Sequence, residues 1–137
     1  MLLQQRTIKQ PVTISGTGLH TGVATTMTFK PAPINHGIKF RRVDLAGSPE
    51  IPAIVDLVVE VARGTTLKLG EAKVHTVEHV LAAIVGMQVD NIVIELNNIE
   101  PPICDGSAKP FVDALFKADF ETQDAPKDYL VIDETVR

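Results

Sequence analysis

The sequence lacks the features of disulfide-rich, secreted or membrane-spanning proteins. Cys104 is its only cysteine, which excludes an intrachain disulfide and a cysteine-rich zinc site and favours a reducing compartment. The longest apolar run covers residues 80–85, far short of the roughly 20 residues that span a membrane. The first ten residues hold no apolar segment long enough for a signal peptide. We therefore expect a cytoplasmic protein with no membrane span.

Aromatic and basic residues are also scarce. There is no Trp, one Tyr and five Phe, so Val, Ile, Leu and Ala must fill the core. The net charge is −4, and no run of Lys and Arg is interleaved with aromatic residues, so we expect no nucleic-acid partner. With 137 residues, 45% apolar and 22% charged, the chain has the size and composition of one globular domain.

Most of the chain shows the patterns of β-strands. Residues 6–15 and 22–30 are rich in Thr, Val and Ile, and the Gly-rich stretch 16–22 between them predicts a hairpin. Residues 57–70 suggest a possible small insertion of two short strands. Further strands are expected over residues 37–43, 92–96 and 129–136, with polar loops over residues 97–102 and 119–128.

Two segments show helical periodicity. The first covers residues 76–86, where Thr76 can cap the helix and Glu78 lies in the first turn. The second covers residues 108–118, and its apolar stripe is Ala108, Phe111, Val112, Leu115 and Phe116. The element order predicts an α+β fold, a two-layer sandwich in which two helices cover one face of a mostly antiparallel sheet. Because the last strand runs to the end of the chain, we expect a fragment cut at a domain boundary.

The segment from His75 to His79 is the strongest candidate for chemistry. On a helical wheel His79 lies about 200° from Val77, on the opposite side from the apolar stripe of Val77, Val80, Leu81 and Ile84. Ala82 and Ala83 share the side of His79, where small residues would let another element approach. A solvated surface histidine remains the plain alternative to a site in a cleft.

Glu78 and His79 together supply two parts of a hydrolytic zinc site. A neutral imidazole binds the metal, and a neighbouring carboxylate can take a proton from the bound water. Catalytic zinc normally has three protein ligands, however, and no histidine follows His79. The pattern H-x-x-E-H also matches inverted zinc metallopeptidases, in which His75 and His79 would share one metal. If Thr76 is the cap, His75 lies outside the helix and that alternative is disfavoured.

Two other polar positions have plainer explanations. The glycines at 16, 18 and 22 do not form the G-x-G-x-x-G pattern, so a hairpin is favoured over a nucleotide loop. His20 lies at the tip of that hairpin, where it either reaches a neighbouring cleft or faces water. Asp105 is expected to form a turn or cap a helix rather than to act in catalysis.

Three segments together resemble one family. They are Gly18-Leu19-His20-Thr21-Gly22, then Thr76-Val77-Glu78-His79, and then Asp90-Asn91-Ile92 through Asp105-Gly106-Ser107-Ala108. With Pro31-Ala32-Pro33 and Phe40-Arg41-Arg42-Val43-Asp44, they are similar to the UDP-3-O-acyl-N-acetylglucosamine deacetylases of lipid A biosynthesis in Gram-negative bacteria. The resemblance runs from about residue 5 to the end of the chain, in the same order and at compatible spacing.

The resemblance implies two similar α+β domains with the active site between them, of which residues 1–137 form the N-terminal one. It implies a zinc cofactor, with His79 as a metal ligand, Glu78 as the general base and His20 in a supporting role. The remaining ligands, a His and an Asp, belong to an H-x-x-x-D helix of the missing second domain. We therefore expect this chain alone to be inactive and not to bind zinc tightly. A metallopeptidase and a non-catalytic sugar-nucleotide binding or scaffold module remain the alternatives.

Overall fold

The structure, a computed structural model, describes residues 3–135 and is built around a five-stranded sheet. The strand order is β2-β3-β9-β4-β5. The bounds are β2 Val12–Thr17, β3 Ala24–Pro31, β9 Ile92–Leu96, β4 Ile38–Arg42 and β5 Glu50–Pro52. Neighbouring strands are antiparallel except β4 and β9, which pair in parallel. The sheet is therefore mostly antiparallel, as the sequence predicted.

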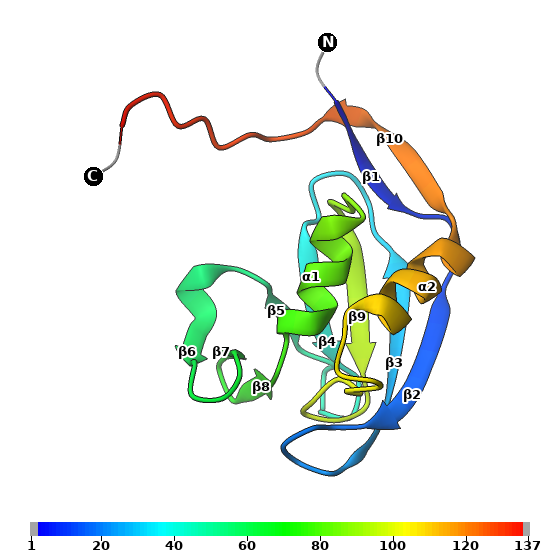
Figure 1. The fold of residues 1–137 in the computed structure, drawn as a ribbon, viewed down its shortest axis with the longest axis vertical. Coiled ribbons are helices and arrows are strands. Elements are labelled where there is room, and N and C mark those ends of the chain that lie inside the picture. Colours follow the sequence, from blue (N-terminus) through cyan, green and yellow to red (C-terminus); the bar gives the residue numbers. More distant parts are fainter. Residues whose placement is uncertain (1–2, 136–137) are drawn as a thin grey trace.

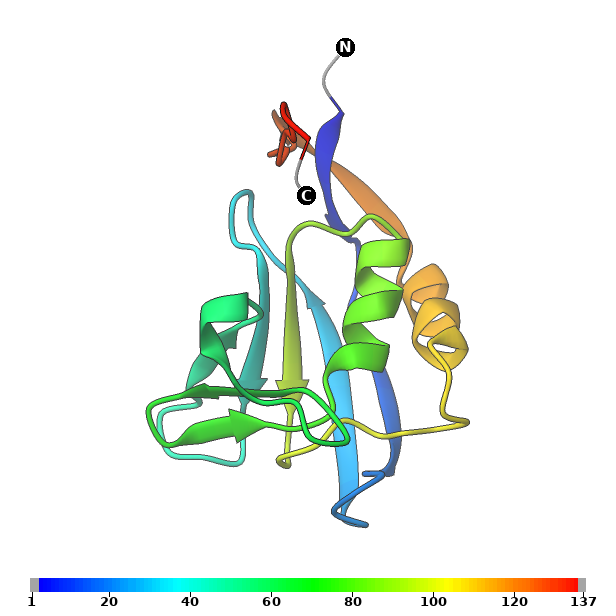
Figure 2. The same cartoon turned by 60° about the vertical axis from the view of Figure 1, so that its left-hand side comes forward.

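Two helices, α1 (Glu78–Gly86) and α2 (Lys109–Ala118), lie on the same face of this sheet (Figures 1 and 2). Their buried residues join those of the strands in a single apolar cluster that includes Met27, Phe29, Phe40, Ile94, Val80, Ile84, Phe111 and Leu115. Fully burying side chains of this size contributes about 1.5–3 kcal/mol each. This confirms the expected α+β fold with two layers.

The remaining strands form two smaller sheets. β1 (Gln4–Ile8) pairs with β10 (Phe120–Pro126), which joins a segment near the start of the described chain to one in its last part. The short strands β6 (Val58–Glu60), β7 (Thr66–Leu69) and β8 (Ala72–Val74) form a three-stranded sheet after the 3-10 turn η1 (Val55–Leu57). Figure 1 shows this small sheet beside the first turn of α1.

The C-terminal part of the sequence-based prediction was wrong. Residues 119–128, expected to be a polar loop, contain β10, and residues 129–135 form no strand. Residue 136, the last of the predicted strand, lies outside the described residues. The segment forms a strand because its backbone pairs with β1, where Phe120 faces Ile8. Neither strand belongs to the five-stranded sheet. The side chains of β10 can therefore be polar while its backbone is hydrogen-bonded to β1.

Three smaller predictions also needed correction. The single strand expected over residues 6–15 is two strands, β1 and β2, in different sheets. Phe116, expected in the buried stripe of α2, is 61% exposed and packs edge-on against Phe120. Ala83 is buried in the core, so only Ala82 remains exposed beside His79.

Within residues 3–135, no helix is both long enough and apolar enough to cross a membrane.

The topology brings several chain turns to one end of the large sheet. β2 and β9 both end there, α1 begins there, and the small sheet lies next to them, at the lower edge of Figure 1. The β2–β3 loop and the start of α1 at this end carry His20, Glu78 and His79.

Candidate active site

Glu78 and His79 are the first two residues of α1. The helix begins after Val77, which is fully buried, so the chain is anchored in the core directly before Glu78 and His79. Val80 and Ile84 are also fully buried, whereas Glu78 and His79 are half-buried. The start of α1 thus presents an acid and an imidazole at the edge of the core.

Thr76 does not cap α1, contrary to expectation. No side chain caps the helix, and Thr76 has a positive φ of 52° that turns its hydroxyl elsewhere. That hydroxyl donates a hydrogen bond of 2.7 Å to Oε1 of Glu100. His75 nevertheless lies outside α1, as the sequence predicted.

Glu78 accepts one hydrogen bond from the protein. The backbone N–H of Thr65, in the loop between β6 and β7, donates to Oε2 of Glu78 at 3.1 Å. This contact joins the small sheet to the first turn of α1. It holds the carboxylate in place while using one of its two oxygens.

The ring of His79 has an unusual environment. Its Nδ1 is buried and has no hydrogen-bond partner among the described residues. An unpaired buried polar atom costs about 1–3 kcal/mol, so this ring is not held by a structural hydrogen bond.

His20 lies in the loop of the β2–β3 hairpin, which the structure confirms. The residue is exposed, and its Nε2 lies 2.8 Å from the carbonyl oxygen of Arg63. Because a carbonyl oxygen only accepts, Nε2 carries the proton in this contact. His20 therefore reaches across to the same β6–β7 loop that holds Glu78.

Gly64 shows how closely these groups approach one another. A methyl group placed on Gly64 would lie 3.4 Å from Oγ1 of Thr76, 3.5 Å from Nε2 of His20 and 3.6 Å from Oε1 of Glu78. Side chains from the His20 loop and from the start of α1 therefore surround one small space at the β6–β7 loop. Next to it is a cavity of about 230 Å³ lined by His20, Thr21, Glu60, Ala62, Gly64, Thr66, His75 and Thr76.

His75 is close to this cavity but does not share a helical face with His79. Its Nδ1 lies 2.8 Å from the hydroxyl of Thr66, and its backbone N–H donates to Ile99 O. The i, i+4 pairing that a metallopeptidase helix would need is not formed. No group of three or more His, Cys, Asp or Glu side chains within residues 3–135 is arranged to hold a metal ion.

Glu100 is a residue that the sequence analysis missed. It lies in the loop after β9, is 1% exposed, and accepts hydrogen bonds from His20, Thr21 and Thr76. Burial alone would raise its pKa, but these hydrogen bonds prevail and lower the pKa of Glu100 to about 2. A glutamate in a polar loop gives no sequence signal of burial, so only the fold reveals it.

Asp105 has the structural role that was expected. Its Oδ1 accepts hydrogen bonds from the backbone N–H and the hydroxyl of Ser107. Ser107 in turn accepts a bond from Lys109 N at the start of α2. These contacts with Ser107 lower the pKa of Asp105, which is exposed.

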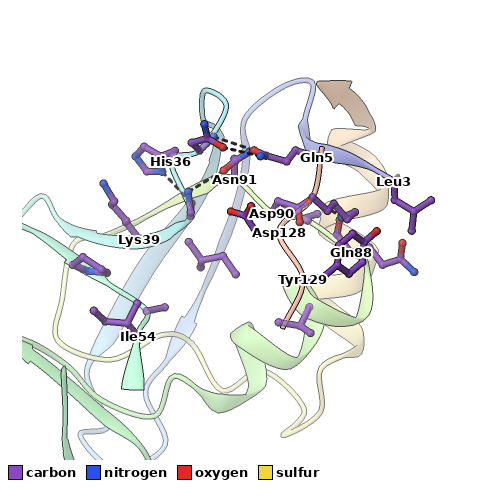
Figure 3. Close-up of a pocket in the computed structure, with 18 residues that line it drawn as sticks. Leu3, Gln5, His36, Lys39, Ile54, Gln88, Asp90, Asn91, Asp128 and Tyr129 are labelled. Atoms are coloured by element: carbon purple, nitrogen blue, oxygen red, sulfur yellow. Dashed lines mark hydrogen bonds and ion pairs between the residues drawn. The ribbon is translucent and has the colours of Figure 1, made fainter. Parts of the chain in front are cut away.

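A larger cavity, of about 770 Å³, lies at the other end of α1 (Figure 3). Its walls include Gln5, His36, Lys39, Asn91 and Tyr129, and dashed lines in Figure 3 mark the hydrogen bonds around Asn91. His20, Glu78 and His79 do not line it. This cavity is therefore separate from the candidate active site.

Comparison with known proteins identifies close relatives. The family model described as "UDP-3-O-acyl N-acetylglycosamine deacetylase" matches residues 5–137. A "Bifunctional enzyme LpxC/FabZ" of Chlorobaculum tepidum is 56% identical over 99% of this chain and 29% of its own length. A "UDP-3-O-acyl-N-acetylglucosamine deacetylase" of Stenotrophomonas maltophilia is 50% identical over 98% of this chain and 45% of its own length. The chain thus spans less than half of the curated relatives that it matches.

Proposed function

The chain belongs to the UDP-3-O-acyl N-acetylglycosamine deacetylase family, and from this premise we propose that it forms the N-terminal domain of a zinc-dependent hydrolase. The proposed reaction removes the acetyl group of a UDP-linked 3-O-acyl-N-acetylglucosamine, in lipid A biosynthesis. The products are acetate and the UDP-linked 3-O-acyl-glucosamine. The observation that carries the proposal is the placement of Glu78 and His79 as the first two residues of α1, with Oε1 of Glu78 and Nε2 of His20 both close to Gly64.

Glu78 is the proposed general base. One carboxylate oxygen is held by Thr65 N–H, which orients the group without neutralising it. Glu78 removes a proton from the water that attacks the acetamide carbonyl, and the proton then goes to the leaving amine. A positioned acid–base group of this kind contributes about 10²–10⁴-fold to the rate.

His79 is the proposed metal ligand, and its surroundings fit that role. Its Nδ1 has no hydrogen-bond partner in the described part of the chain, so no structural hydrogen bond at this atom competes with metal binding by the ring. A bound zinc ion lowers the pKa of water to about 7 and polarises a carbonyl oxygen. Because residues 3–135 hold no group of three or more His, Cys, Asp or Glu side chains that could bind a metal ion, the other ligands are assigned to a second domain.

His20 is proposed to support the reaction rather than to perform it. Its Nε2–H is directed to Arg63 O, and its ring lies near Oε1 of Glu78 across Gly64. In this place it can contact substrate that occupies the adjoining cavity. The lone free Cys104 suits a reducing compartment, and we place the reaction in the cytoplasm.

Because the proposed site is shared between two domains, the 137-residue chain and a complete two-domain protein should differ in activity and zinc content. The complete protein should release acetate from the UDP-linked substrate and contain one zinc ion, whereas residues 1–137 alone should do neither. Acetate release and metal analysis on both proteins test this. Zinc-dependent acetate release by the 137-residue chain would contradict the shared site, and no release by the complete protein would contradict the activity.

A further inference from the structure

Glu100 is the most completely hydrogen-bonded side chain near the site. The backbone N–H of His20 lies 3.1 Å from Oε1 and 3.2 Å from Oε2, and Thr21 N–H donates to Oε2 at 2.9 Å. The hydroxyls of Thr21 and Thr76 add bonds of 2.8 and 2.7 Å. Every partner donates, so the carboxylate acts purely as an acceptor.

No ion pair within residues 3–135 includes Glu100. Burying a charge without a cationic partner is costly unless hydrogen bonds replace its hydration. Here neutral backbone and hydroxyl groups do so, and the pKa of Glu100 falls to about 2. Glu100 is therefore charged near neutral pH.

The bonds of Glu100 join the segments that carry the site. His20 and Thr21 belong to the β2–β3 loop, and Thr76 lies two residues before Glu78. The backbone of Gly18 also packs closely against Glu100, because a methyl group on Gly18 would lie 2.4 Å from Oε2 of Glu100. Within residues 3–135, no other side chain is hydrogen-bonded to both the His20 loop and Thr76.

We propose that Glu100 is a positioning residue, which fixes the His20 loop against the start of α1 so that His20 and Glu78 face the same bound substrate. This inference rests on the proposed function. Displacing a catalytic group by about 1 Å can cost up to 10²-fold in rate. The role requires an acceptor at this place, and Gln can supply one oxygen to the two backbone N–H groups while the Thr76 hydroxyl rotates to accept.

The test compares Glu100→Ala and Glu100→Gln in the complete, zinc-loaded protein. For Glu100→Ala we expect kcat to fall at least about 10-fold, KM to change less than about 3-fold, and zinc content to be unchanged. Glu100→Gln should recover most of kcat. Asn91→Ala is the matched control, because Asn91 is also 1% exposed and multiply hydrogen-bonded, but lines the cavity at the far end of α1.

A second measurement keeps the inference testable if Glu100→Ala does not fold. Thr76→Ala removes only the link to α1 and should also lower kcat more than it raises KM. In the 137-residue chain, the backbone amide proton of His20 should exchange with solvent faster in Glu100→Ala than in Asn91→Ala. Equal loss of kcat in Glu100→Ala and Asn91→Ala, or unchanged kcat in Glu100→Ala, overturns the positioning role alone. Absence of acetate release from the unaltered protein overturns the proposed function, and this inference with it.

Discussion

The hydroxyl of Thr76 donates its hydrogen bond to Glu100, 24 residues further along the chain, and not to the first turn of α1. The helix that carries Glu78 and His79 is therefore fixed by a tertiary contact in place of a local cap. An N-cap side chain contributes about 1 kcal/mol to a helix, and the structure gives up that contribution. In return, the same hydroxyl ties the start of α1 to the carboxylate that also holds the His20 loop.

The depressed pKa of Glu100 predicts how stability depends on pH. Its folded-state pKa of about 2 lies below the ordinary value of 4.5, so its contribution is complete above pH 4.5 and is lost as the pH falls toward 2. A shift of this size corresponds to about 3 kcal/mol. We expect the unaltered chain to be more stable than Glu100→Gln at pH 7, and the difference to shrink below pH 4.5. Urea unfolding of both proteins between pH 7 and 3 measures it, and a constant difference would contradict the shift.

Gly18→Ala should strongly destabilise the chain. The new methyl group would lie 2.4 Å from Oε2 of Glu100 and 2.5 Å from Oγ1 of Thr21, and Glu100 is too buried to move aside. Overpacking of this kind costs about 1–3 kcal/mol. Gly86→Ala is the control, because nothing lies within 4 Å of the added atom at the end of α1. Thermal unfolding should show a lower Tm for Gly18→Ala only. Equal Tm values would mean that the loop is not tightly packed on Glu100.

Local sequence patterns predicted the elements in which burial against the sheet or the core produces a regular spacing of apolar residues. The strand over residues 92–96 has the observed bounds of β9, because its apolar residues are buried in the sheet. The helix predicted over residues 76–86 overlaps α1, because Val80 and Ile84 face the core. Glu78, His79 and His20 were singled out from motifs, and the fold brings the start of α1 and the β2–β3 loop to one end of the sheet.

The errors arise where distant segments decide the structure. β10 is polar and was predicted to be a loop, but pairing with β1 at the other end of the chain makes it a strand. Thr76 has the composition of a cap, yet its hydroxyl is taken by Glu100. Glu100 itself lies between Asn98 and Pro101 in a segment with no periodicity. Such contacts depend on backbone positions far apart in sequence, which no local pattern contains.

Glu78→Gln in the complete protein tests the proposed role of Glu78 as general base. The amide oxygen of Gln can still accept the hydrogen bond from Thr65 N–H, so the fold and the zinc content should be preserved. Because an amide cannot take up the proton of the attacking water, turnover should fall about 10²–10⁴-fold. Acetate release under substrate saturation measures kcat. Unchanged turnover at full zinc content would remove Glu78 from the base role.

His79→Leu separates metal binding from stability. In the complete protein this variant should lose zinc, because the proposed ligand is gone. In the 137-residue chain, however, it should not lower the free energy of unfolding by more than about 1 kcal/mol, since it removes a buried Nδ1 that has no partner among residues 3–135. His75→Ala gives the opposite pattern: zinc stays, and stability falls as the contact with Thr66 is lost. Loss of zinc in His75→Ala would favour a metallopeptidase-like pair, and a large loss of stability in His79→Leu would show that the ring serves the fold.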